Sequence, residues 1–121
     1  MATVLLIDDD AHIRAFVERL LRSAGYEVIS AGDGKAGLEA LRLHNPDLVI
    51  TDIIMPKQEG IETITRIREA SQVPIIAISG SIVTENFDPL RDAGALGADV
   101  TIAKPFRGAD LLAAVAKLLA P

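Results

Sequence analysis

The 121-residue sequence contains no cysteine and no tryptophan, and only 3% of its residues are aromatic. Without cysteine, the chain cannot form a disulfide, a thiolate zinc site or a thiol nucleophile. Three Phe and one Tyr supply too little aromatic surface for the stacking platforms that bind single-stranded nucleic acid. Since half of all residues are nevertheless apolar, the core must be built from Val, Ile, Leu and Ala.

Positive charge is also scarce, because 12 Lys and Arg residues stand against 17 Asp and Glu residues and give a net charge of -5. This charge balance argues against sequence-independent binding to the phosphate backbone of nucleic acids, so we expect no direct nucleic-acid binding. No positively charged N-terminal region leads into a long apolar run, and no segment approaches the length needed to cross a membrane. We therefore expect a cytoplasmic protein that does not contact a membrane. The length predicts a single domain spanning residues 1–121.

Five short apolar runs alternate along the chain with segments of helical periodicity. Continuously apolar runs of this length are typical of strands buried on both faces of a sheet, and they cover residues 3–7, 26–31, 48–51, 73–78 and 100–103. Between them, apolar residues three and four positions apart predict amphipathic helices. The predicted helix N-caps are Asp10, Asp33 and Asp88. Residues 55–60 are predicted to form a loop, because Pro56 and Gly60 punctuate it.

The strict alternation of strand and helix predicts an α/β fold with a parallel sheet covered on both faces. Right-handed crossovers favour the flavodoxin-like, doubly wound (βα)5 arrangement, in which five parallel strands lie in the order 2-1-3-4-5. Ligands of such sheets bind beyond the carboxyl ends of the strands, beside the switch point between strands 1 and 3. The functional site is therefore expected at that edge.

Polar side chains follow four of the five predicted strands at the point where each strand ends. Each has a structural explanation when taken alone: a helix cap, a turn former or a strand terminator. Because the carboxyl ends of parallel strands share one edge, the structural explanation would require four coincidences at that edge. The residues are Asp8-Asp9-Asp10 after the first strand, Asp52 after the third, Ser79 after the fourth and Lys104-Pro105 after the fifth.

Carboxylates gathered at one edge repel one another unless a cation lies between them. Oxygen ligands without His or Cys suit a hard divalent ion such as Mg²⁺. Lys104 adds a positive charge and Ser79 a hydroxyl donor, which together with a metal are what the oxygens of a transferring phosphoryl group need. Asp52 is then the natural nucleophile, because a carboxylate can accept a phosphoryl group as an acyl phosphate. His12 and His44 are interpreted as solvated helix positions.

Over essentially its whole length, the sequence resembles the receiver domains of two-component response regulators. The resemblance rests on Ile7-Asp8-Asp9-Asp10, Thr51-Asp52-Ile-Ile-Met-Pro56 with Gly60, Ile78-Ser79-Gly80, Gly97-Ala98-Asp99 and Lys104-Pro105-Phe106. It implies that Asp52 is the phosphoacceptor and that the phosphoryl group comes from a phosphohistidine on a histidine kinase or histidine phosphotransfer protein. It also implies that Mg²⁺ is bound directly by Asp9, Asp52 and the backbone carbonyl of Ile54, and by Asp8 through water. Ser79 and Lys104 would hold the phosphoryl oxygens, and the Lys104–Pro105 peptide bond would be cis.

The resemblance further implies a switch, in which phosphorylation pulls Ser79 inward and repacks the face made by the fourth helix, the fifth strand and the fifth helix. Thr101 stands three residues before Lys104, where the family usually has an aromatic residue. A small polar side chain cannot fill and vacate a pocket as a ring does, so an unusual readout is expected. The same face permits a weak dimer, although a monomer is equally compatible with the sequence.

The leading interpretation is a stand-alone receiver, a signalling switch that catalyses only its own phosphorylation and a slow autodephosphorylation. Apolar Ile54 cannot orient the water that hydrolyses the acyl phosphate, so slow loss of the phosphoryl group is expected. The close alternative is a receiver domain excised from a larger regulator or from a hybrid histidine kinase.

Two alternatives come from other functional classes. A Mg²⁺-dependent phosphohydrolase with an aspartyl-phosphate intermediate usually needs a second acid two residues after the nucleophile, and Ile54 occupies that position. A flavin- or nucleotide-binding module would need a Gly-rich or Ser/Thr-rich loop after the first strand to cradle phosphate. This chain has three aspartates there instead, and acids repel phosphate in the absence of a metal.

Overall fold

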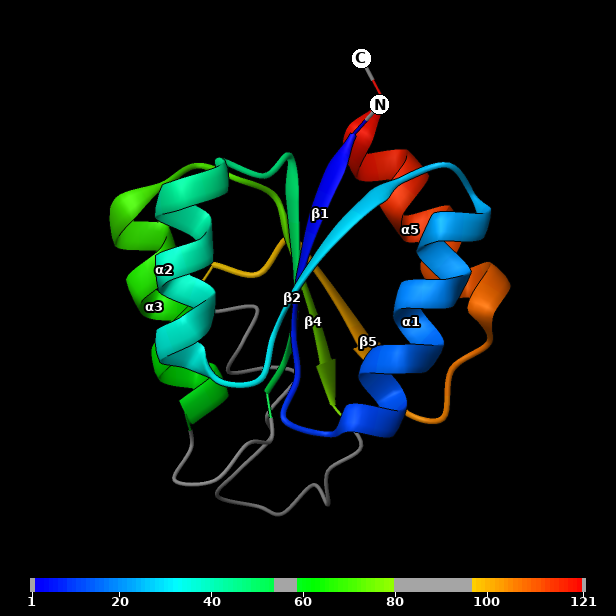
Figure 1. Cartoon of the computed structure of the whole chain (residues 1–121), viewed down its shortest axis with the longest axis horizontal. Helices are drawn as coiled ribbons and strands as arrows, with labels where there is room; N and C mark the ends of the chain where they lie inside the picture. Colours follow the sequence, from blue (N-terminus) through cyan, green and yellow to red (C-terminus); the bar gives the residue numbers. More distant parts are fainter. Residues whose placement is uncertain (1, 54–58, 80–96, 121) are drawn as a thin grey trace.

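The computed structural model describes residues 2–53, 59–79 and 97–120, and Figure 1 shows their arrangement. Strands and helices follow one another along the chain. The elements are β1 (Thr3–Ile7), α1 (Ala11–Ser23), β2 (Glu27–Ala31), α2 (Gly34–His44), β3 (Leu48–Asp52), α3 (Glu59–Ala70), β4 (Ile75–Ser79), β5 (Val100–Ala103) and α5 (Gly108–Leu119). None of the helices in these ranges is long and apolar enough to span a bilayer.

The five strands form one parallel sheet in the order β2-β1-β3-β4-β5, which confirms the predicted topology. Figure 1 shows α2 and α3 on one face of the sheet and α1 and α5 on the other, with the carboxyl ends of the strands at the lower edge. The helix predicted to open at Asp88 lies outside the described residues, as do Ile54 and Pro56. The part of the predicted output face that this helix would form therefore stays a prediction.

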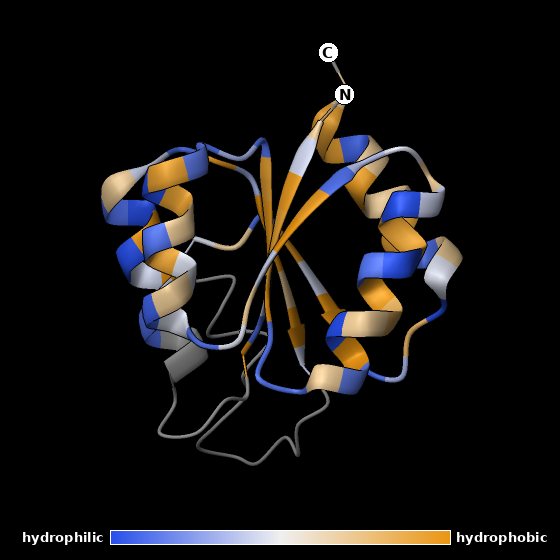
Figure 2. Ribbon diagram, in the orientation of Figure 1, coloured by the Kyte–Doolittle hydropathy of each residue, from blue (hydrophilic) through white to orange (hydrophobic). Residues whose placement is uncertain are grey.

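The core consists of two apolar layers, one on each face of the sheet. Along β1, Leu5 and Ile7 contribute to the layer beneath α2 and α3, whereas Val4 and Leu6 contribute to the layer beneath α1 and α5. This division follows from the alternation of side chains along a strand. In Figure 2 the strands and the sheet-facing sides of the helices are hydrophobic, while the outward sides are hydrophilic. Strands buried on both faces explain why the sequence shows solid apolar runs.

Two predicted N-caps hold the helices that open beside the sheet edge. The Asp10 carboxylate accepts hydrogen bonds from the backbone N–H groups of His12 and Ile13, and these bonds lower the pKa of Asp10. The Asp33 carboxylate accepts from the N–H of Ala36 at 2.7 Å. Both caps satisfy donors that a helix leaves without intrahelical partners.

Two predicted boundaries are wrong by two residues. The strand expected at 73–78 begins at Ile75, because Pro74 has no N–H for the ladder, although its carbonyl accepts from the N–H of Val49. The loop expected at 55–60 ends earlier, because α3 begins at Glu59 and includes Gly60. Glycine keeps its backbone N–H, and its conformational entropy costs a helix only about 1 kcal/mol, so Gly60 does not prevent the helix from forming there.

Phe16 is a third departure from expectation. The spacing of Ile13, Phe16 and Leu20 predicts that Phe16 lies on the apolar stripe of its helix, yet Phe16 is 52% exposed. The side chains of α1 that are fully buried are Val17 and Leu21, and Phe16 lies at the margin of the stripe that they define. An exposed ring at this position is a feature of the surface rather than of the core.

Arg68 joins the end of α3 to the strands that follow. Its Nη1 donates to the carbonyl oxygens of Ser71, at 3.3 Å, and Val73, at 2.9 Å. Its Nη2 donates to the carbonyl oxygen of Gly97, at 2.8 Å, and to Oδ2 of Asp99, at 3.1 Å. Gly97 has a φ of +120°, and a Cβ added there would lie 3.1 Å from Nε of Arg68, so only glycine suits the position. The Gly97-Ala98-Asp99 motif thus has a structural role.

Replacing Arg68 by Ala is expected to lower the free energy of unfolding by about 2–4 kcal/mol, because three partly buried carbonyls lose a charged donor. The measurement is urea denaturation followed by circular dichroism. The matched control on the same helix is Arg66→Ala, which removes only an exposed i,i+4 pair with Glu62 at 3.0 Å. Such a pair contributes less than about 1 kcal/mol. Equal losses from the two substitutions would contradict the prediction.

Candidate phosphoryl-transfer site

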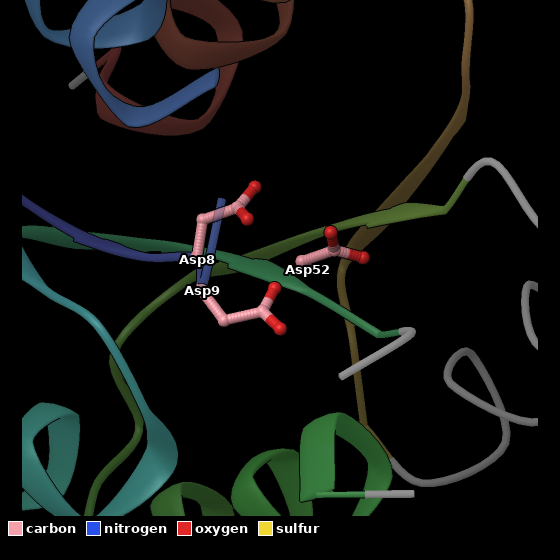
Figure 3. A group of neighbouring side chains, drawn as sticks. All are labelled: Asp8, Asp9 and Asp52. Atoms are coloured by element: carbon pink, nitrogen blue, oxygen red, sulfur yellow. The ribbon is translucent and has the colours of Figure 1, made fainter. Parts of the chain in front are cut away.

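Three carboxylates meet at the carboxyl edge of the sheet. Asp8 and Asp9 follow β1, Asp52 ends β3, and these two strands are neighbours. One carboxylate oxygen from each residue lies within 4.8 Å of the others. Figure 3 shows the three side chains converging on one region. The donor set consists of oxygen alone, which fits a hard divalent cation such as Mg²⁺.

Asp8 is the most constrained of the three acids. It is only 3% exposed, and its Oδ1 accepts a hydrogen bond from the Asp10 N–H at 2.9 Å. Burial raises the pKa of Asp8 from 3.8 to about 6, and the charge of Asp52 adds to this rise, while the Asp10 hydrogen bond opposes it. A cation bound between these acids would compensate the negative charge of the ionised Asp8 carboxylate.

Lys104 supplies a positive charge at the same edge. Its Nζ lies 2.9 Å from Oδ2 of Asp52 and 4.0 Å from Oδ2 of Asp8. Its backbone N–H donates to the carbonyl oxygen of Ser79 at 2.8 Å, which fixes the end of β5 against the end of β4. The Lys104–Pro105 peptide bond is cis.

The remaining predicted residues occupy different environments. Ser79 is the last residue of β4 and is 2% exposed; it follows Ile78, which pairs in register with Asp52. Thr101 lies on β5 at the edge of the sheet, is exposed to solvent, and pairs in register with Ala77. The structure therefore brings Ser79 to the acidic edge and leaves Thr101 on the surface.

Sequence reasoning missed Arg14. Its Nη1 donates to the backbone carbonyl oxygen of Asp8 at 2.7 Å, from the first turn of α1. A basic side chain in the first turn opposes the helix dipole. That unfavourable placement was the one signal in the sequence that Arg14 has a partner elsewhere.

An apolar groove flanks the acidic edge. It is lined by Ile13 and the half-exposed Phe16 from α1, together with Lys104, Pro105 and Phe106 from the segment after β5. The sequence pattern places Phe16 on the apolar stripe of a helix and Phe106 in the motif after the fifth strand, and it does not predict that the two residues share a surface. The groove and the carboxylates share Lys104, so they form one continuous region.

Comparison with known proteins identifies the family to which the chain is similar. A family model described as response regulator receiver domain matches residues 4–116. The transcriptional regulatory protein PdtaR of Mycobacterium tuberculosis is 37% identical over 113 residues, which cover 93% of this chain and 54% of that protein.

Solved structures of response regulators are similar to the chain in fold and in sequence. The chemotaxis protein CheY4 of Vibrio cholerae is 33% identical, with a TM-score of 0.87 over 98% of this chain and 99% of that one. The receiver domain of the Francisella response regulator 1452 is 29% identical, with a TM-score of 0.86 over 98% and 96% of the two chains. The chain spans about half the length of the curated relatives that it matches.

Proposed function

The chain belongs to the family of response regulator receiver domains, the switches of two-component signalling, and we propose on this basis that Asp52 is its phosphoacceptor. One observation carries the assignment. The Asp52 carboxylate, 5% exposed, has Lys104 at 2.9 Å and two further carboxylates within 4.8 Å. The proposed chemistry of the chain is limited to the phosphorylation of Asp52 and a slow autodephosphorylation. In this proposal the chain acts as a signalling switch.

In the proposed step, a carboxylate oxygen of Asp52 attacks the phosphorus of a phosphohistidine on a histidine kinase or histidine phosphotransfer protein. A P–O bond forms and the P–N bond breaks. The electron pair of the broken bond stays on the imidazole nitrogen, and Asp52 carries an acyl phosphate. Lys104 already contacts an oxygen of Asp52, so its ammonium is placed to donate to a phosphoryl oxygen of the product. The Ser79 hydroxyl is the proposed second donor.

The carboxylates of Asp8, Asp9 and Asp52 are the proposed holders of Mg²⁺. Asp9 and Asp52 are assigned as direct ligands and Asp8 as a ligand through water. The Ile54 carbonyl, a further proposed ligand, lies outside the described residues. When bound, Mg²⁺ neutralises charge on the oxygens of the transferring group. Burial and, to a smaller extent, the charge of Asp52 raise the pKa of Asp8, and this supports the proposal because a bound cation would stabilise the ionised carboxylate.

The experiment that tests the function uses the wild-type chain, Mg²⁺ and acetyl phosphate as a small phosphodonor. Intact mass is expected to show one added phosphoryl group per chain, mapped to Asp52 by peptide mass spectrometry. Chelation of Mg²⁺ is the control and should prevent the labelling. A folded wild-type chain that takes up no group, or that carries it on another residue, would refute the proposal.

A phosphohistidine partner must cover the edge that holds Asp52, and the apolar groove beside Lys104 is the proposed place of contact. Phe16→Ala is expected to slow phosphoryl transfer from a phosphorylated histidine kinase about tenfold, since an aromatic anchor at an interface contributes more than about 1 kcal/mol. Labelling by acetyl phosphate should not change, because that donor needs no docking surface.

The matched control is Leu43→Ala, which truncates another exposed apolar side chain, 70% exposed and located on α2. It is expected to leave both reactions unchanged. Equal slowing by the two substitutions, or slowing of the acetyl phosphate reaction by Phe16→Ala, would count against the docking assignment.

A further inference from the structure

The backbone that carries Asp8 and Asp9 is held by groups from two neighbouring elements. The Asp8 N–H donates to the carbonyl oxygen of Ala31, the last residue of β2, at 3.1 Å. The Asp8 carbonyl oxygen accepts from Nη1 of Arg14 at 2.7 Å. That carbonyl belongs to the peptide unit that joins Asp8 to Asp9, so Arg14 fixes the orientation of the peptide from which Asp9 projects.

The position of the Asp9 carboxylate depends on the orientation of this peptide more than the positions of the Asp8 and Asp52 carboxylates do. Asp8 is buried and bonded to the Asp10 N–H, whereas Asp52 is buried and paired with Lys104. Among the described residues, the exposed Asp9 carboxylate makes neither a hydrogen bond nor an ion pair. The backbone therefore sets the direction from which the Asp9 side chain approaches Asp52 (Figure 3).

Arg14 differs from Lys104 in what it contacts. Lys104 binds a carboxylate oxygen, whereas Arg14 binds a backbone carbonyl and leaves all three carboxylates available to a cation. The turn after β2 makes room for this arrangement, because a Cβ added at Gly32 would lie 3.3 Å from Nη1 of Arg14. The guanidinium thus packs against a residue without a side chain while it bonds the Asp8 carbonyl.

We infer that Arg14 is a positioning residue of the cation site, which acts through the Asp8 carbonyl to direct the carboxylate of Asp9. The inference rests on the proposed Mg²⁺ site and assigns a role outside its ligand set. Residues that orient metal ligands typically contribute about 10–100-fold to metal affinity.

The substitution Arg14→Met separates positioning from electrostatics by the sign of its effect. Removing a positive charge near three carboxylates would by Coulomb's law tighten the binding of a cation. If Arg14 positions Asp9, Mg²⁺ should instead bind about tenfold more weakly. The measurement is the Kd for Mg²⁺ from calorimetric titration, at a temperature where circular dichroism shows the variant to be fully folded.

Arg19→Met is the matched control, because it removes the same charge from an exposed position on α1. It should leave the Kd within about twofold of the wild-type value, as expected for a screened surface charge. If Arg14→Met does not fold, Arg14→Gln serves in its place, since glutamine is too short to reach the carbonyl and the same weakening is expected.

Unchanged or tighter Mg²⁺ binding by the folded Arg14 variant would overturn the inference and leave the proposed function intact. A wild-type chain that fails to bind Mg²⁺ and takes up no phosphoryl group would instead overturn the metal site on which the inference rests.

Discussion

Asp52→Asn is expected to take up no phosphoryl group from acetyl phosphate, whereas the wild-type chain takes up one. An amide has the shape of the carboxylate but lacks the anionic oxygen that attacks phosphorus, so the acyl phosphate cannot form. Loss of a nucleophile typically lowers a rate by roughly a thousandfold or more, which in a labelling assay is complete loss. The fold should survive, because Asp52 ends a strand whose other residues are Leu48, Val49, Ile50 and Thr51.

The control is Asp9→Asn, which removes an exposed carboxylate of the same cluster and keeps the nucleophile. Labelling of this variant should be slow but measurable, and it should recover at higher Mg²⁺ concentration. Retention of the full label by folded Asp52→Asn would mean that the reaction occurs elsewhere on the chain.

The order of the strands could be predicted because it depends on features that the sequence displays directly. Strands buried on both faces must be apolar throughout, and helices that begin beside the sheet need caps such as Asp10 and Asp33. Right-handed crossovers then leave few ways to arrange five parallel strands. The convergence of Asp8, Asp9 and Asp52 follows from that topology alone, because adjacent parallel strands end at the same edge.

The acceptors of Arg14 and Arg68 could not be predicted, for a common physical reason. Both side chains donate to backbone carbonyls, and a carbonyl is present at every residue, so the sequence does not identify which carbonyl accepts the hydrogen bond. The exposure of Phe16 was missed for a different reason. Helical periodicity identifies an apolar stripe but does not show where the covering elements end.

The pairing of charges inside the cluster also required the structure. Lys104 could have lain between Asp8 and Asp52, yet its Nζ is 2.9 Å from Asp52 and 4.0 Å from Asp8. Asp52 consequently has a compensating charge that Asp8 shares only weakly. Burial is the main cause of the raised pKa of Asp8, and Lys104 at 4.0 Å opposes that rise only in part.

In the metal-free protein, ionisation of Asp8 is expected to lower the free energy of unfolding by about 2 kcal/mol between pH 4 and pH 7. The pKa of Asp8 is about 6 in the folded chain and near 3.8 in the unfolded chain. Between these values the folded state binds more protons than the unfolded state, so stability falls as the pH rises. The contribution is fully present below pH 3.8 and is lost as the pH passes through 6. The whole difference between the two pKa values corresponds to about 3 kcal/mol, of which about 2 kcal/mol is lost between pH 4 and pH 7.

The substitution Asp8→Asn isolates this contribution, because asparagine keeps the oxygen that accepts from the Asp10 N–H and cannot ionise. Asp10 titrates in the opposite sense, since its pKa is lowered, but it is present in both chains and cancels in the difference. Urea unfolding at a series of pH values should show the variant gaining about 2 kcal/mol relative to the wild type between pH 4 and pH 7. Parallel curves would contradict the assignment to Asp8.

Saturating Mg²⁺ should stabilise the wild type more than the variant. A cation and a proton compete for the buried Asp8 carboxyl, and only the wild type can replace the proton there with Mg²⁺.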